Sequence, residues 1–114
     1  PPSTSSSPTT TPTMRVITAQ GRVTIDEGRS RLLSTGLRVA VTDTYGTFAY
    51  FNASTDDNDC GNREVHVGES LVIQGTEDTW HRLIADSMSA SAVVFDWQFG
   101  NGPEPAATNH CWYR

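Results

Sequence analysis

Polar and apolar side chains alternate along several stretches of the chain, and this period of two narrows the possible folds more than any other feature. In residues 91–99 the apolar side chains fall on every second position: Val93, Phe95, Trp97 and Phe99. Polar side chains, including Asp96 and Gln98, lie between them. Because successive side chains of a strand point to opposite faces, this stretch predicts a strand whose apolar face, with Trp97, packs into a core.

Shorter stretches of the same kind occur along the rest of the chain, separated by residues that favour turns. We expect strands at residues 14–19, 22–26, 37–42, 47–51, 64–67, 71–73 and 111–113, and a strand or sheet edge at residues 31–33. A turn is expected at Gln20 and Gly21. Residues 100–105 contain two glycines and two prolines and are predicted to form a loop.

Residues 80–88 fit two kinds of secondary structure. Trp80, Leu83 and Ile84 have the spacing of one helical face, whereas in a strand Trp80, Arg82 and Ile84 would share a face. The short strands and turns on either side favour the strand. The chain is therefore predicted to be all-β, a single antiparallel β-sandwich or small barrel of about seven or eight strands.

The first thirteen residues are all proline, serine or threonine. A segment of this composition has too little apolar surface to form a core, so residues 1–13 are predicted to be an extended tail and residues 14–114 the β domain. Three roles suit such a tail: a spacer, an O-glycosylated stalk, or an arm that docks on a partner.

The two cysteines, Cys60 and Cys111, lie far apart and form no C-x-x-C pair. In a small exported domain this predicts one disulfide, with a lone reactive thiol as the alternative. The chain does not begin with methionine, which suits a mature protein whose signal peptide has been removed. We expect a secreted, extracellular protein, or one held at the cell surface by a lipid anchor.

The charge of the chain bears on its partners. All eight basic residues are arginine, and thirteen acidic residues bring the net charge to −5. Without a cluster of basic side chains a nucleic-acid partner is not expected. No apolar stretch approaches the roughly 20 residues that a transmembrane helix needs, so no membrane span is expected.

The loop over residues 54–62 is the densest group of oxygen-bearing side chains in the sequence. Its aspartates, Asp56, Asp57 and Asp59, are candidate calcium ligands, because calcium binds six to eight oxygen atoms. The spacing is not that of an EF-hand, since Val67 stands where the bidentate glutamate belongs. The alternative is an acidic turn without a metal, and this is the interpretation that we favour.

The sequence contains no recognisable catalytic motif. His66, His81 and His110 have no second ligand at metal-binding spacing, and no Gly-x-Ser-x-Gly segment is present. A triad or a carboxylate pair assembled from distant residues leaves no local pattern. The chain is therefore predicted not to be an enzyme and to hold no cofactor.

Several aromatic side chains are expected to be exposed. Tyr45 lies in a predicted turn, and Trp112 and Tyr113 lie beside Cys111. Exposed aromatic rings anchor protein partners or stack on sugars. Together with the beginning of the first predicted strand they make up the candidate partner-binding residues: Thr13, Met14, Val16, Tyr45, Trp112 and Tyr113.

A Pro/Ser/Thr tail joined to a small β domain with one cysteine pair resembles the exported modules of filamentous actinobacteria. The organisation is similar to that of the adaptor subunit of umbrella-like antibacterial toxin particles, an exported β domain that connects a lectin-like subunit to the toxin stalk. It also resembles carbohydrate-binding modules, whose cysteine pair usually brackets the module, and secreted protease inhibitors, which usually have two disulfides. The resemblance covers organisation and no motif, so it implies no site residue.

We expect an exported, non-catalytic domain that binds another secreted or cell-surface protein as an adaptor in an extracellular assembly. The resemblance implies a secreted antibacterial toxin complex as that assembly. Pairing of a partner strand through main-chain hydrogen bonds, with residues 1–19 as the expected segment, is the physical route. A carbohydrate-binding module is the first alternative, and a secreted protease inhibitor is the second.

Overall fold

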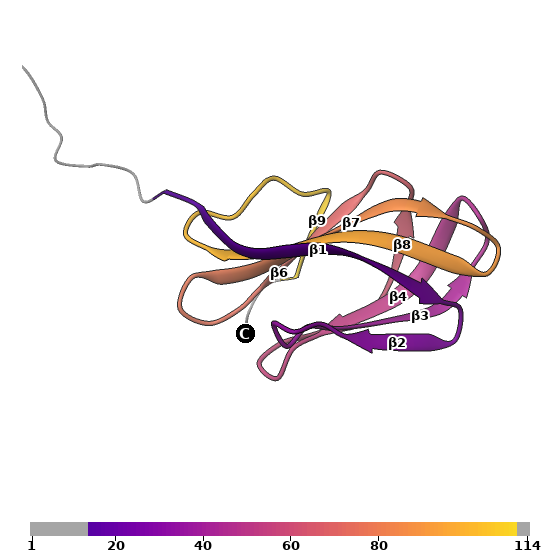
Figure 1. The fold of residues 1–114 in the computed structure, drawn as a ribbon, viewed down its shortest axis with the longest axis horizontal. Coiled ribbons are helices and arrows are strands. Elements are labelled where there is room, and N and C mark those ends of the chain that lie inside the picture. The colour runs from indigo at the N-terminus through magenta and orange to yellow at the C-terminus, as the bar shows by residue number, and fades with distance from the viewer. Residues whose placement is uncertain (1–13, 112–114) are drawn as a thin grey trace, which may run out of the picture.

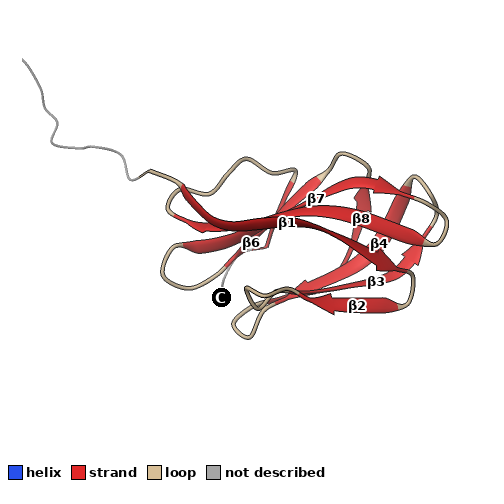
Figure 2. Cartoon of the chain, in the orientation of Figure 1, coloured by secondary structure: helices blue, strands red, loops and turns tan. Residues whose placement is uncertain are grey.

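The computed structural model describes residues 14–111, which form nine strands and no helix (Figure 2). The strands are β1 (Val16–Asp26), β2 (Arg29–Leu32), β3 (Arg38–Thr44), β4 (Phe48–Ser54), β5 (Asp59–His66), β6 (Ser70–Gln74), β7 (Thr79–Met88), β8 (Ala92–Asn101) and β9 (Asn109–Cys111). The all-β prediction is confirmed. None of the described residues forms a helix that could span a membrane.

The strands form two sheets, one of five strands in the order β1-β8-β7-β6-β9 and one of four in the order β2-β3-β4-β5 (Figure 1). Neither sheet closes on itself within residues 14–111, so the structure is not a closed barrel. Nine strands replace the predicted seven or eight. Pairing is antiparallel as predicted, except that β9 runs parallel to β6.

The two sheets pack their apolar faces against each other. Side chains at alternate positions of β1, β3, β4 and β8 are buried between them, among them Val23, Ile25, Val39, Val41, Phe51, Val93 and Phe95. The rings of Phe51 and Phe95, one from each sheet, have centroids 5.4 Å apart. The period of two in the sequence thus places the core correctly, because each strand contributes one face to it.

A covalent link joins the two sheets on each side. On one side the chain passes from β1 to β2 through a tight turn, in which Gly28 has a φ of 79° that favours glycine. On the other side Cys60 of β5 and Cys111 of β9 form the predicted disulfide, with Cα atoms 5.7 Å apart. A disulfide of this kind indicates an oxidising environment.

Several of the predicted boundaries are wrong. Strand β5 begins at Asp59, inside the predicted loop 54–62, and β9 begins at Asn109, ahead of the strand expected at 111–113. No turn separates residues 14–19 from 22–26, because β1 continues through Gly21. A Cβ atom on Gly21 would lie 3.0 Å from Nε1 of Trp97, so the glycine leaves room for the indole on β1. The predicted loop at 100–105 begins later, since Gly100 belongs to β8 and β1 approaches it closely.

Residues 80–88 form strand β7, as the favoured interpretation predicted. Trp80 lies on the face of β7 that points away from the other sheet, yet it is fully buried. The connection from β8 to β9 crosses this face, where Glu104 accepts a hydrogen bond from Gln74 and Thr108 exchanges hydrogen bonds with Ser70. This crossover brings β9 into the sheet beside β6.

Candidate functional site

The structure places the candidate partner-binding residues in separate regions. Val16 is the first residue of β1 and Met14 lies two residues before it, whereas Tyr45 follows β3 in the other sheet. Thr13, Trp112 and Tyr113 lie outside the described residues. The described candidates therefore belong to two different surfaces, the β1 edge and an aromatic patch.

The β1 edge is the long side of β1 that does not face β8. Among the described strands β1 pairs with β8 alone and ends the five-stranded sheet. At 11 residues it is about twice the usual strand length. It contains no proline, which would remove a main-chain donor. A long edge of this kind is open to pairing with another strand.

The register shows which main-chain groups of β1 are free to pair. Glu27, directly beyond β1, donates its N–H to the carbonyl of Ser91 at 2.8 Å. In an antiparallel ladder, pairs that exchange hydrogen bonds alternate with pairs whose main-chain groups point away. Odd-numbered residues 21–25 therefore face β8, and the residues whose N–H and C=O groups point to the open edge are Gln20, Arg22, Thr24 and Asp26.

The beginning of the β1 edge is apolar. Met14, Val16 and Ile17 are 77%, 49% and 45% exposed, respectively. A bulge between Ile17 and Ala19 interrupts the register with β8, and from Ala19 to Asp26 the pairing is regular. The edge thus combines a regular segment for main-chain pairing with adjacent apolar side chains that a partner can cover.

The aromatic patch consists of Tyr45, Phe48, Tyr50 and His66 on the outer face of the four-stranded sheet. Tyr45 stacks on Phe48 with centroids 4.8 Å apart, and Phe48 stacks on His66 at 5.7 Å. Since β3 and β5 flank β4 on opposite sides, Tyr45 and His66 cover opposite faces of the Phe48 ring. Tyr45 is 57% exposed and ends this stack.

Glu64 links the polar atoms of the aromatic patch. Its carboxylate accepts a hydrogen bond from the Tyr50 hydroxyl at 3.2 Å and contacts Nε2 of His66 at 2.6 Å. The negative charge of Glu64 raises the pKa of Tyr50 above its ordinary value. The hydrogen bond with His66 lowers the pKa of Glu64 below its ordinary value. The patch therefore carries an ionised carboxylate beside its rings at neutral pH.

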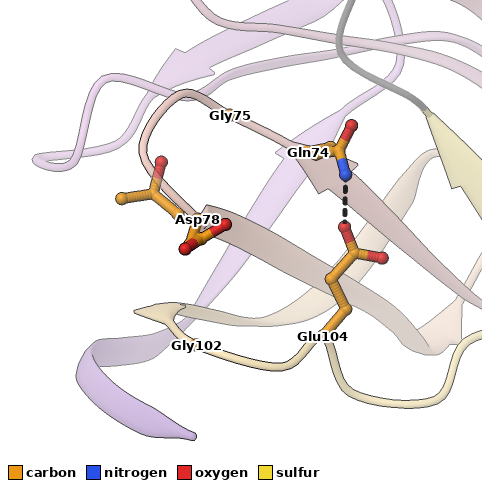
Figure 3. Close-up of a pocket in the computed structure, with 6 residues that line it drawn as sticks. Gln74, Gly75, Asp78, Gly102 and Glu104 are labelled. Carbon is orange, nitrogen blue, oxygen red and sulfur yellow. Dashed lines mark hydrogen bonds between the residues drawn. The ribbon is translucent and has the colours of Figure 1, made fainter. Parts of the chain in front are cut away.

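A polar hollow of about 330 Å³ lies at the end of the five-stranded sheet (Figure 3). It is lined by Gln74, Gly75, Asp78, Thr79, Gly102 and Glu104. Gln74 and Glu104 point toward each other and are joined by a hydrogen bond of 3.1 Å, while Asp78 lies apart on the β6–β7 loop. Of the two carboxylates that line the hollow, that of Glu104 therefore already holds the β8–β9 connection on β6.

The predicted calcium loop has a structural role in the described fold. Asp59 accepts the N–H of Gly61 at 2.9 Å, and Thr55 accepts the N–H groups of Asp57 and Asn58. Asn58 is buried and donates to a β6 carbonyl at 2.9 Å. Within residues 14–111 no group of three His, Cys, Asp or Glu side chains is arranged to hold a metal ion.

The histidines differ in their surroundings. His66 is exposed, as expected for the polar face of its strand. His81 is buried, contacts the Thr35 hydroxyl through Nε2 at 2.7 Å, and lies 4.6 Å from the ring of Phe99. Burial lowers the pKa of His81 to about 4, so its imidazole is neutral at neutral pH. It therefore supports the packing of the β2–β3 loop on β7.

Sequence reasoning missed most of the aromatic patch. Phe48 and Tyr50 alternate with Ala49 and Phe51, and this alternation places them on the outer face once Phe51 is assigned to the core. That signal was present in the sequence. The pairing that brings His66 beside Phe48 depends on the β4–β5 register and leaves no local pattern.

Comparison of the chain with known protein families, with curated proteins and with solved structures gave no match in any of the three.

Proposed function

We propose that the chain is an exported, non-catalytic binding domain that attaches to another secreted or cell-surface protein by pairing a partner strand with the β1 edge. The observation that carries this proposal is the open main-chain row of β1, flanked by exposed Met14, Val16 and Ile17. Main-chain hydrogen bonds supply the affinity of such pairing, and alternate side chains supply its specificity.

The surrounding fold suits this role. We infer that the two sheets act as a rigid β-sandwich, because they share one core and are tied together by the β1–β2 turn and the disulfide. A rigid edge strand loses less conformational entropy on binding than a flexible segment does. The disulfide also favours a secreted protein. An adaptor role in an extracellular assembly, such as an antibacterial toxin complex, follows from the resemblance in organisation.

The aromatic patch favours a protein partner over a sugar. A sugar platform needs several open ring faces side by side, whereas both faces of Phe48 are covered by Tyr45 and His66 and Tyr50 stands perpendicular to the stack. A carbohydrate-binding module is therefore the weaker alternative.

Replacing Thr24 with proline tests the proposal, because the Thr24 N–H points to the open edge and is not used by β8. Proline at such a position removes an outward donor while the fold is kept. In capture experiments from medium conditioned by the producing cells, Thr24→Pro is expected to retain about tenfold less of the partner that wild type retains. Quantitative mass spectrometry of the retained proteins measures the difference.

Thr24→Val is the matched control, since it keeps the N–H and the β-branched shape and replaces the hydroxyl with a methyl group. It is expected to retain the partner as wild type does, and circular dichroism should show an unchanged fold for both variants. Equal retention by Thr24→Pro and Thr24→Val would reject the β1 edge as the binding site. Retention of a polysaccharide in place of a protein would favour the carbohydrate-binding alternative.

A further inference from the structure

We propose that the aromatic patch is a second binding site, which receives an arginine side chain of a partner protein on the ring of Tyr45. The site lies on the four-stranded sheet, whereas the β1 edge belongs to the five-stranded sheet. Two partners can therefore be held at once. The inference extends the proposed function but does not depend on the β1 edge.

The geometry of the rings leaves one face of Tyr45 open. Phe48 covers the other face, with ring planes 23° apart. Tyr50 is perpendicular to both rings and nearly equidistant from them, at 6.3 Å from Tyr45 and 6.1 Å from Phe48. A ring equidistant from two stacked rings lies beside the stack and not at its end. The outward face of Tyr45 is therefore covered by none of the described rings.

One exposed carboxylate, that of Asp43, lies on β3, the strand that leads into Tyr45, whereas Glu64 lies across β4 and is held by Tyr50 and His66. Asp43 precedes Tyr45 by two residues, and Glu64 lies on β5. Asp43 lies opposite Tyr50 in the β3–β4 pairing and contributes, less than Glu64 does, to raising the pKa of Tyr50. The described salt bridges of arginine, from Arg22 to Asp86 and Asp96, lie on the other sheet. The aromatic patch thus presents negative charge beside an exposed ring.

A guanidinium group complements this arrangement. It is planar, stacks on an aromatic face and donates paired hydrogen bonds to a carboxylate. A single open ring face is sufficient for it, whereas a sugar chain requires several. An ammonium group binds carboxylates as a point charge and gains less from the ring. The chemistry therefore selects arginine over lysine and over a neutral side chain.

A hexa-arginine peptide, titrated into the isotope-labelled full chain at physiological salt, tests the site. The amide signals of Asp43 and Tyr45 are expected to shift most. Tyr45→Ser and Asp43→Asn should each weaken binding by about threefold to tenfold, from the loss of the ring face or of one carboxylate. Hexa-lysine should bind more weakly than hexa-arginine, and hexa-citrulline, which has the same shape without the charge, should not bind.

Asp56→Asn is the matched control, because it makes the same change of charge in the exposed loop after β4. It should bind hexa-arginine as wild type does. The proposal is overturned if Asp43→Asn and Asp56→Asn weaken binding equally, if lysine and arginine peptides bind alike, or if the shifts centre on Asp78 and Glu104. None of these results depends on the Thr24→Pro comparison, so the two proposals fail separately.

Discussion

Replacing Cys60 and Cys111 together with alanine is expected to lower the free energy of unfolding by about 4 kcal/mol. The bridge spans 51 residues of sequence, and closing a loop of that length restricts the unfolded chain strongly. It also joins the edge strands β5 and β9 of the two sheets. Urea unfolding of wild type and variant under non-reducing conditions measures the difference.

A second variant separates the bridge from the polarity of its replacement. Cys111 is only 4% exposed, so serine at this position would bury a hydroxyl. The Cys60→Ser and Cys111→Ser pair should therefore be less stable than the alanine pair, while wild type in reducing buffer should resemble the alanine pair. A loss below about 1 kcal/mol for the alanine pair would contradict the role given to the disulfide.

Acidification is expected to destabilise the fold by about 3 kcal/mol through His81 alone. Burial lowers the pKa of His81 from 6.5 to about 4 in the folded state. Between these values the unfolded chain binds a proton that the folded chain does not. The contribution of His81 is thus fully present above pH 6.5 and is lost progressively as the pH falls to 4. Urea unfolding at several pH values measures the slope.

The variant His81→Gln isolates this contribution, because carboxylates also titrate near the lower limit. Glutamine keeps a group that can hydrogen bond to Thr35 but has no proton to gain in this range. Its stability should fall less between pH 6.5 and 4 than that of wild type. An equal slope in His81→Gln would show that His81 is not buried as described.

The sequence predicts the strands well where one face of a strand lies in the core. Val93 and Phe95 of β8 and the buried side chains of β3 follow the period of two, and both are found between the sheets. The same reasoning fails for β1, because a glycine such as Gly21 is typical of a turn. The glycine is instead needed because Trp97 packs against it, from a strand more than seventy residues away in the sequence.

The crossover and the strand order could not be predicted from local pattern. Trp80 is buried on the face opposite the main core, where Glu104 of the β8–β9 connection binds Gln74, the neighbour of Trp80 across β6 and β7. This contact joins segments distant in sequence. Likewise, strand β1 (Val16–Asp26) is an edge strand because β8 pairs with it on one side and no described strand pairs with it on the other. The partner-binding role of Met14 and Val16 stays a prediction, as it was from the sequence.

Amide hydrogen exchange along β1 tests the central claim most directly, in the free chain and in the purified complex with the captured partner. In the free chain the amides that face β8 should exchange slowly, and those of Gln20, Arg22, Thr24 and Asp26 should exchange fast. In the complex we expect this second row to slow by about tenfold or more. Unchanged fast exchange of that row in an intact complex would contradict the proposal that a partner strand pairs with the β1 edge.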